Sequence, residues 1–166
     1  MLMRATAALL ILTAAIGIAR ADDASGCEKF KWSIAHERAW FAANPKPVAA
    51  GADVTSGDGA YAVALVAGDA AVFPVSPERP PKAGTFGGVV KTNIPKAGLY
   101  QVTLSDEAWI DVVQNGARVK SSDFSGQKAC PGVRKSVRFD LAAGPATLQI
   151  SNSENAKINL AIAPGE

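Results

Sequence analysis

The chain has 166 residues, of which 48% are hydrophobic and 19% are charged, a length and composition typical of one globular domain. This composition excludes a disordered polyelectrolyte, a collagen and a coiled coil. One histidine and two cysteines are too few for a zinc finger or a His/Cys-rich metal cage.

Residues 1–21 have the three parts of a secretory signal peptide. Arg4 supplies the positive charge, residues 5–18 form an uninterrupted apolar and small-residue run, and Ala19-Arg20-Ala21 is an A-x-A cleavage site. The run is shorter than the ~20 residues that a transmembrane helix needs, and no later segment is apolar enough to span a membrane. We therefore expect a periplasmic or secreted protein. Cleavage would leave equal numbers of basic and acidic residues, which disfavours nucleic acid as a partner.

Cys27 and Cys130 are the two cysteines of the chain. In an oxidising compartment they most simply form one disulfide, which would tie the N-terminal segment to the C-terminal half. The alternative is a lipoprotein anchor, because Ala24-Ser25-Gly26-Cys27 resembles a lipobox. That alternative places lipid on Cys27 and leaves Cys130 as a free thiol.

Residues 27–43 are predicted to form an N-terminal helix, capped by Asp23 or Ser25 and ended by Asn44-Pro45. At 100° per residue, Phe30, Ile34 and Phe41 share one stripe, whereas Trp32 lies on the opposite side. A helix with two apolar sides either lies across the rest of the domain or docks a partner protein.

Two stretches have the composition of irregular structure. Residues 44–59 are rich in Pro, Gly, Ala and Asp and are predicted to be a connection, and residues 74–84 hold four prolines and are predicted to be an extended loop. Together, residues 22–59 are expected to form the N-terminal helix and a linker.

The rest of the chain, residues 60–166, alternates apolar and polar residues in short runs. This period of two is typical of antiparallel strands with one buried face. Asn115-Gly116 is a strong hairpin signal, and Gly87-Gly88 indicates a bulge or a close backbone approach. The predicted strands cover residues 60–66, 86–94, 99–104, 107–114, 117–121, 134–141, 147–151 and 157–162. We expect a jelly-roll-like antiparallel β-sandwich of about seven or eight strands.

Part of this region resembles known jelly-roll modules. The stretches that carry the resemblance are Gly98-Leu99-Tyr100-Gln101-Val102-Thr103-Leu104, Trp109-Ile110-Asp111-Val112-Val113-Gln114-Asn115-Gly116 and Val137-Arg138-Phe139-Asp140-Leu141-Ala142-Ala143-Gly144. Their rhythm over residues 98–163 is similar to that of PA14, prepeptidase-C-terminal and galactose-binding-like modules. The resemblance implies a secreted β-sandwich that binds carbohydrate or assists a partner. The chain lacks an adjacent Asp pair near a sandwich loop, so the calcium site of the lectin members is not carried over.

Motifs of catalysis are missing from the sequence. It has no nucleophile elbow, no Walker A loop and no H-E-x-x-H. His36, beside Glu37 and Arg38, is expected to be an exposed histidine. We therefore expect neither enzymatic activity nor a cofactor or metal ion. A hydrolase is kept as a minor alternative, because the spacing of two carboxylates depends on tertiary structure.

Two groups of residues are candidates for a ligand-binding face. Trp109 and Asp111 share the face opposite Ile110 and Val112, where an indole beside a carboxylate could stack on a sugar and bind its hydroxyls. The alternative is that the N-terminal helix covers Trp109, with Trp32 or Trp40 against it.

The second candidate group is cationic. Arg118 and Lys120 share one strand face, and Arg134 and Arg138 share another. If these strands are neighbours, four cations converge and can bind an anion.

These patterns lead to two main hypotheses. The first is a secreted, non-enzymatic binding or accessory module for a saccharide or an anionic envelope component. The second is an inhibitor or subunit of a secreted enzyme that contacts its partner through the N-terminal helix. The sequence leaves the oligomeric state open.

Overall fold

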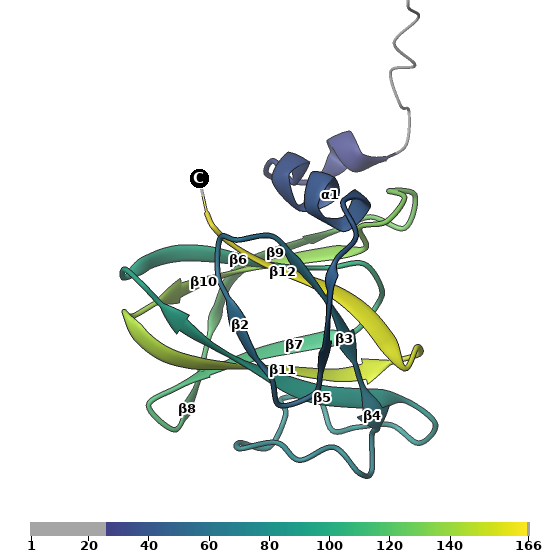
Figure 1. Cartoon of the computed structure of the whole chain (residues 1–166), viewed down its shortest axis with the longest axis vertical. Helices are drawn as coiled ribbons and strands as arrows, with labels where there is room; N and C mark the ends of the chain where they lie inside the picture. The colour runs from purple at the N-terminus through teal and green to yellow at the C-terminus, as the bar shows by residue number, and fades with distance from the viewer. Residues whose placement is uncertain (1–25, 166) are drawn as a thin grey trace, which may run out of the picture.

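Two β-sheets face each other in a computed structural model that describes residues 26–165 (Figure 1). Sheet A has the strand order β1-β3-β12-β6-β10-β9, and sheet B has the order β2-β5-β11-β7-β8, with β4 paired to β5. The strands of sheet A are β1 (Lys46–Ala49), β3 (Ala60–Ala64), β12 (Lys157–Pro164), β6 (Gly98–Leu104), β10 (Lys135–Leu141) and β9 (Ser121–Gly126). Those of sheet B are β2 (Asp53–Thr55), β5 (Phe86–Ile94), β11 (Gly144–Ser153), β7 (Trp109–Gln114), β8 (Ala117–Val119) and β4 (Val66–Ala67). The predicted sandwich is confirmed, and it is consistent with a jelly-roll-like fold.

The core lies between the sheets and consists of the apolar residues that alternate along the strands. Leu104, Phe139, Leu148, Leu160 and Ile162 are at most 1% exposed. The faces predicted for these strands are therefore confirmed. Burial of each large side chain contributes roughly 1.5–3 kcal/mol before chain entropy is subtracted.

The sandwich has twelve strands instead of the predicted seven or eight. The prediction that residues 44–59 are only a connection is wrong, because this stretch contains β1 and β2. Both are short edge strands that pair in parallel, β1 with β3 and β2 with β5. Pro47 lies in β1, and an edge strand tolerates proline because one side of it needs no ladder hydrogen bonds. Such a strand has no alternation that the sequence could reveal.

The expected turn chemistry is present. Asn115 and Gly116 have φ of 52° and 74° between β7 and β8, as a type I′ hairpin turn requires. Gly88 lies where a Cβ atom would be 2.9 Å from the Cβ of Ala50, and the register with β11 shifts between Ile150 and Ser153. Gly87-Gly88 is thus a close approach, and the irregularity lies in the partner strand β11, opposite Gly87.

The N-terminal segment is less helical than predicted. A 3₁₀ helix, η1 (Cys27–Lys29), and an α-helix, α1 (Ala35–Ala42), replace the expected single helix over residues 27–43. The chain between them is pulled onto sheet A by tertiary contacts, since the Lys31 N–H donates to Ser125 Oγ at 3.1 Å. The helix ends where predicted, with Asn44 in the left-handed region before Pro45. The suggested caps Asp23 and Ser25 lie outside the described residues.

The predicted disulfide is confirmed. Cys27 and Cys130 are bonded, with Cα atoms 4.6 Å apart and a sequence separation of 103. In the chain-entropy model, closing a loop of this length stabilises the fold by up to about 4.7 kcal/mol. The bond lies in a small second core with Phe30, Ile34 and Val133.

Because Cys130 is in the disulfide, it is not the free thiol that the lipoprotein alternative required. The disulfide also indicates an oxidising, extracytoplasmic environment. The predicted signal peptide and the first half of the lipobox, Ala24 and Ser25, lie outside the described residues. Within residues 26–165, no helix is long and apolar enough to cross a membrane.

Candidate functional site

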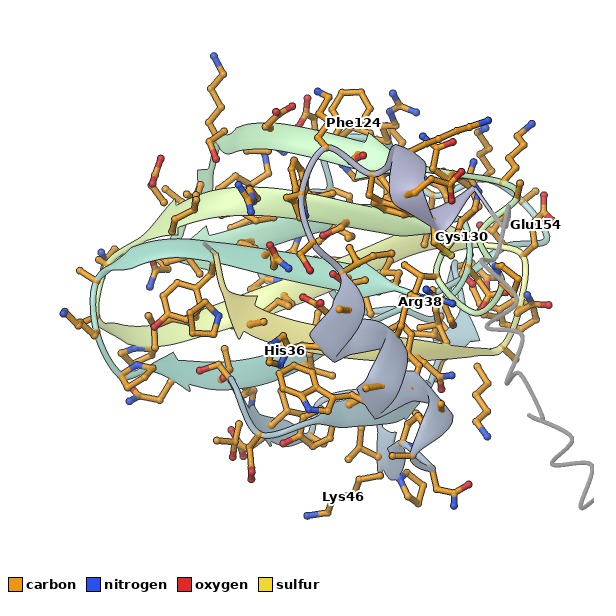
Figure 2. All side chains as sticks on the ribbon, turned by 90° about the horizontal axis from the view of Figure 1, so that it is seen from above. His36, Arg38, Lys46, Phe124, Cys130 and Glu154 are labelled. Carbon is orange, nitrogen blue, oxygen red and sulfur yellow. A yellow bond between two sulfur atoms is a disulfide. The ribbon has the colours of Figure 1, made fainter. Side chains whose placement is uncertain are left out.

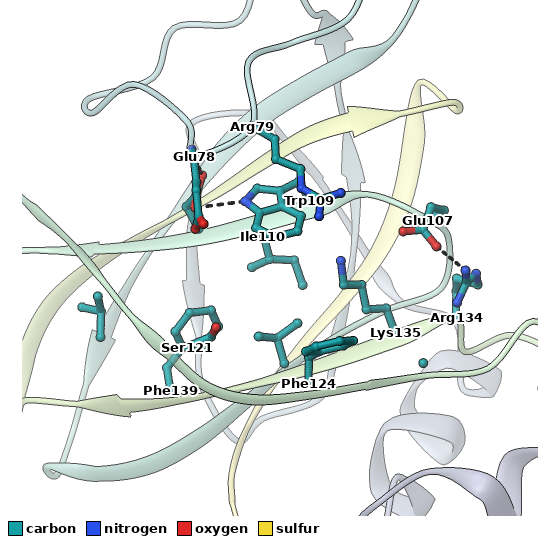
Figure 3. A pocket seen from close by; sticks show the side chains of 14 residues that line it. Glu78, Arg79, Glu107, Trp109, Ile110, Ser121, Phe124, Arg134, Lys135 and Phe139 are labelled. Carbon is teal, nitrogen blue, oxygen red and sulfur yellow. Dashed lines mark hydrogen bonds and ion pairs between the residues drawn. The ribbon is translucent and has the colours of Figure 1, made fainter.

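A cleft of about 390 Å³ opens at the edge of the sandwich where β7 and β8 of one sheet face β9 and β10 of the other (Figure 3). We call it the edge cleft. Its inner part is apolar and its mouth is charged. The residues that line it are Glu78, Arg79, Glu107, Trp109, Ile110, Asp111, Val119, Ser121, Phe124, Gly126, Arg134, Lys135, Val137 and Phe139.

The cleft exists because the two sheets end differently. In sheet A the edge strand β9 has six residues, whereas β8 at the edge of sheet B has three. Phe124 of β9 is paired with Val137 of β10, so the two side chains share the face that looks toward sheet B. Val137 is 5% exposed, but Phe124 is 63% exposed. Phe124 therefore occupies a position on the inner face that no strand of sheet B covers, at the sheet edge visible in Figure 2.

Trp109 and Asp111 lie on the outer face of sheet B, as predicted, and they bind each other. Trp109 Nε1 donates to Asp111 Oδ1 at 3.1 Å, and Asp111 Oδ2 accepts the Glu78 N–H at 3.1 Å. Asp111 is 4% exposed. The indole N–H and both carboxylate oxygens are thus already engaged within the protein.

The prediction that the N-terminal helix covers Trp109 is wrong. The helix lies on sheet A, whereas the loop between β4 and β5 lies on the outer side of sheet B (Figure 1). This loop contains the predicted proline-rich stretch, and side chains of sheet B hold its backbone. Gln149 accepts the Val75 N–H, Arg118 donates to the Ser76 carbonyl, and Asn152 accepts the Lys82 N–H.

Two cations lie over the indole ring of Trp109. The Arg79 guanidinium carbon is 4.0 Å and Lys135 Nζ is 4.8 Å from the ring centroid. Such cation–π contacts contribute about 0.5–2 kcal/mol each, depending on solvation. The indole therefore positions two charges, and sugar stacking on this ring would have to displace one of them.

Lys135 is the more buried of the two cations over Trp109. Its ammonium donates to the Ala108 carbonyl at 3.1 Å. Burial lowers the pKa of Lys135, and the nearby Arg79 and Arg134 lower it further, against the opposing effect of Glu107. Figure 3 shows the side chain pointing between Trp109 and Phe124.

The structure does not bring the four sequence-predicted cations together. Arg118 belongs to sheet B and binds Ser76, whereas Lys120 is exposed in the link between β8 and β9. Arg134 pairs with Glu107 at the cleft. Arg138 lies on the outer face of sheet A, with its guanidinium carbon 4.2 Å from the centroid of Trp32.

The N-terminal segment uses much of its own apolar and polar surface against sheet A. Trp32 Nε1 donates to Ser136 Oγ at 3.1 Å beneath Arg138. The buried Glu37 carboxylate accepts a hydrogen bond from Gln101. His36 is exposed, as predicted, and contacts Trp40 edge-to-face.

Sequence reasoning missed three residues of the edge cleft. Arg79 was inside a loop, Phe124 was inside the polar run Ser121-Ser122-Asp123-Phe124-Ser125, and Lys135 was one position of the alternating run predicted over residues 134–141. The one available signal was that Lys135 shares the inward parity of Val137 and Phe139. A lysine at an inward position is uncommon and indicates a strand end or a site.

Among residues 26–165, no group of three or more His, Cys, Asp or Glu residues is arranged to hold a metal ion. No protein-family model, no curated protein and no solved structure matches this chain.

Proposed function

We propose that this protein is a secreted, non-enzymatic binding module and that its ligand enters the edge cleft. The observation that carries the proposal is Phe124, an aromatic side chain on the inner face of sheet A that is 63% exposed. A ligand with an apolar surface that covers Phe124 would complete the core at this edge. The gain would be roughly 25 cal/mol for each Å² of apolar surface removed from water.

The dimensions of the cleft agree with this role. Its volume of about 390 Å³ lies within the range of roughly 300–1,000 Å³ found for small-molecule sites. An apolar interior formed by Ile110, Val137 and Phe139 and a charged mouth are the usual combination in such sites.

Binding is favoured over hydrolysis because two of the three carboxylates that line the cleft, all but Glu78, are held by other groups. Asp111 is held by Trp109 and by the Glu78 N–H, and Glu107 is paired with Arg134. Each of these two carboxylates would have to leave its present partner before it could act on a substrate.

Of the two ligand classes expected from the sequence, the anionic one fits the cleft better than a neutral saccharide stacked on Trp109. Phe124 has a single cation over its ring, Lys31 at 5.5 Å from the centroid, and Lys31 is paired with Asp123. Trp109 carries two closer cations, Arg79 and Lys135. The resemblance of residues 98–163 to PA14, prepeptidase-C-terminal and galactose-binding-like modules supports a binding role in general.

The experiment is a fluorescence titration with N-phenyl-1-naphthylamine, a neutral apolar probe. We expect saturable binding with one site per chain, and Phe124→Ser should weaken it about tenfold or more. The matched control is Val72→Ser, because Val72 is 83% exposed and lies outside the cleft. Equal binding by the two variants, or no saturable binding by the wild-type protein, would refute the proposal.

Enzymatic activity is tested separately with chromogenic esters, glycosides and phosphates. Turnover that disappears in Asp111→Asn and Glu107→Gln would replace the binding module by a hydrolase. The hypothesis of a protein partner bound through the N-terminal helix stays a prediction.

A further inference from the structure

Two side chains at the mouth of the edge cleft carry positive charge without an ion pair among the described residues. They are Arg79 and Lys135, and both lie over the ring of Trp109. The third cation at the mouth, Arg134, is paired with Glu107. Lys135 satisfies one N–H on the Ala108 carbonyl, and an ammonium has three to donate.

These two cations come from different elements and are held in place by the fold. Lys135 begins β10, whereas Arg79 belongs to the loop that crosses the outer face of sheet B. Asn152 fixes the loop at Arg79 and just after it, since its Nδ2 donates to the carbonyls of Arg79 and Pro80 and its Oδ1 accepts the Lys82 N–H. The convergence is therefore a built feature of the loop and the sheet.

Placing two like charges together costs free energy because they repel each other, and Lys135, which is half-buried, also loses hydration, whereas Arg79 is exposed. The charged groups that act on Lys135 are Arg79, Arg134 and Glu107, and Glu107 is already bound to Arg134. Two more carboxylates line the cleft: Asp111, which is bound to Trp109 and the Glu78 N–H, and the exposed Glu78. An anion brought by a ligand would offset this cost by accepting hydrogen bonds from both free cations.

The same cleft offers an apolar surface directly next to these cations. Phe124 lies on the other side of Lys135 from Trp109 (Figure 3), and Ile110, Val137 and Phe139 line the space behind it. A ligand that uses both parts carries a negative head group on an apolar body.

We infer that Lys135 and Arg79 form a carboxylate-binding subsite for a small amphipathic anion whose apolar body lies against Phe124 in the edge cleft. The inference rests on the proposed binding function, because it assumes that the cleft takes a ligand. A fatty acid and an aryl glycoside of a uronic acid share this chemistry.

The test compares two probes with the same aromatic body. N-phenyl-1-naphthylamine is neutral, and 8-anilino-1-naphthalenesulfonate adds one negative charge. We expect the wild-type protein to bind the anionic probe roughly tenfold to a hundredfold more tightly, as a charge-assisted hydrogen bond at a shielded site would give. Lys135→Met and Arg79→Gln should each reduce this preference and leave binding of the neutral probe nearly unchanged.

The matched control is Lys46→Met, which removes an exposed cation from the edge strand β1 on the far side of sheet A (Figure 2). This variant should keep the wild-type preference. If the two probes bind equally well, or if Lys46→Met changes the preference as much as Lys135→Met, the carboxylate subsite is refuted. The proposed function would still stand in that case, because it depends on the neutral probe and on Phe124.

Competition against the anionic probe identifies the source of the carboxylate. Displacement by decanoate but not by 4-nitrophenyl β-D-glucuronide would support a fatty acid, and the reverse would support an acidic saccharide. The neutral 4-nitrophenyl β-D-glucoside should displace the probe less well than the glucuronide does. Failure of both carboxylates to displace the probe would overturn the inference.

Discussion

Phe124 and Val137 are direct partners across β9 and β10 and share the inner face of sheet A, yet Phe124 is 63% exposed and Val137 is 5% exposed. One step toward the sheet edge thus separates a core residue from an uncovered one. This difference defines the edge cleft, and it has measurable consequences for stability.

We predict that Val137→Ala lowers the free energy of unfolding by about 2 kcal/mol, because it removes buried methyl groups and leaves a cavity. Phe124→Ala should change it by no more than about 0.5 kcal/mol, since most of the ring is already in water. Urea denaturation followed by circular dichroism measures both values. A loss at Phe124 as large as that at Val137 would mean that another part of the chain covers the ring in solution.

Most strands of the sandwich can be predicted from the alternation of apolar and polar residues, whereas the edge cleft cannot. The alternation around Val102, Phe139 and Ile150 determines which face is buried, so the strands and their orientation are predictable. The strand β1 pairs at an edge and contains Pro47, so it has no such pattern. The helix ends at Asn44-Pro45 as predicted, but tertiary contacts at Lys31 and Trp32 break its first half.

The site depends on relationships that the sequence does not contain. Arg79 reaches Trp109 because Asp111 and Asn152, far later in the chain, bind the loop at Glu78 and Arg79. Phe124 is exposed because β8, in the opposite sheet, is short. The four predicted cations do not converge, because the strands of Arg118 and Arg138 belong to different sheets.

The second prediction concerns pH. Burial holds the pKa of Lys135 in the folded chain below its ordinary value of 10.5. Between these two pKa values, the unfolded chain binds more protons at this residue than the folded chain does. The stability of the wild-type protein relative to Lys135→Met should therefore rise as the pH rises through the folded-state pKa toward 10.5. Affinity for the anionic probe should fall over the same interval, because the ammonium loses its charge.

Chemical denaturation and probe titration between neutral pH and pH 10 measure these two trends. Lys46→Met serves as the control and should show the wild-type trend. A constant difference in stability between the wild-type protein and Lys135→Met would show that Lys135 titrates as an ordinary lysine. A fall in that difference would contradict the prediction outright.

The third prediction concerns the disulfide. The double variant Cys27→Ser/Cys130→Ser should unfold with a free energy about 2–5 kcal/mol lower than that of the wild-type protein. The loss should be concentrated in the small core around Phe30 and Ile34, because the bond holds this segment on sheet A. Limited proteolysis should then cut the N-terminal segment before the sandwich.

Reduction of the wild-type protein should reproduce the behaviour of the double variant, and reductant should not affect the variant itself. If a reductant leaves both the stability and the cleavage pattern of the wild-type protein unchanged, the noncovalent contacts of Trp32 and Lys31 are sufficient to hold the segment.

The last prediction separates positioning from contact at the carboxylate subsite. Asn152 lies outside the residues that line the cleft, but it binds the loop at Arg79, Pro80 and Lys82. Its φ is 59°, so Asn152→Gly removes the side chain without straining the backbone.

Asn115→Gly is the matched control, because Asn115 has a φ of 52° in the hairpin between β7 and β8. The bond from the Glu78 N–H to Asp111 remains in this variant, but Arg79 loses its own anchor. The ligand must then order Arg79, at a cost of about 0.5–1.5 kcal/mol for such a side chain. Asn152→Gly should therefore weaken the anionic probe roughly twofold to tenfold and leave the neutral probe unchanged, whereas Asn115→Gly should affect neither. Equal weakening of both probes by Asn152→Gly would instead mean that the loop supports the whole cleft and that Arg79 has no separate role.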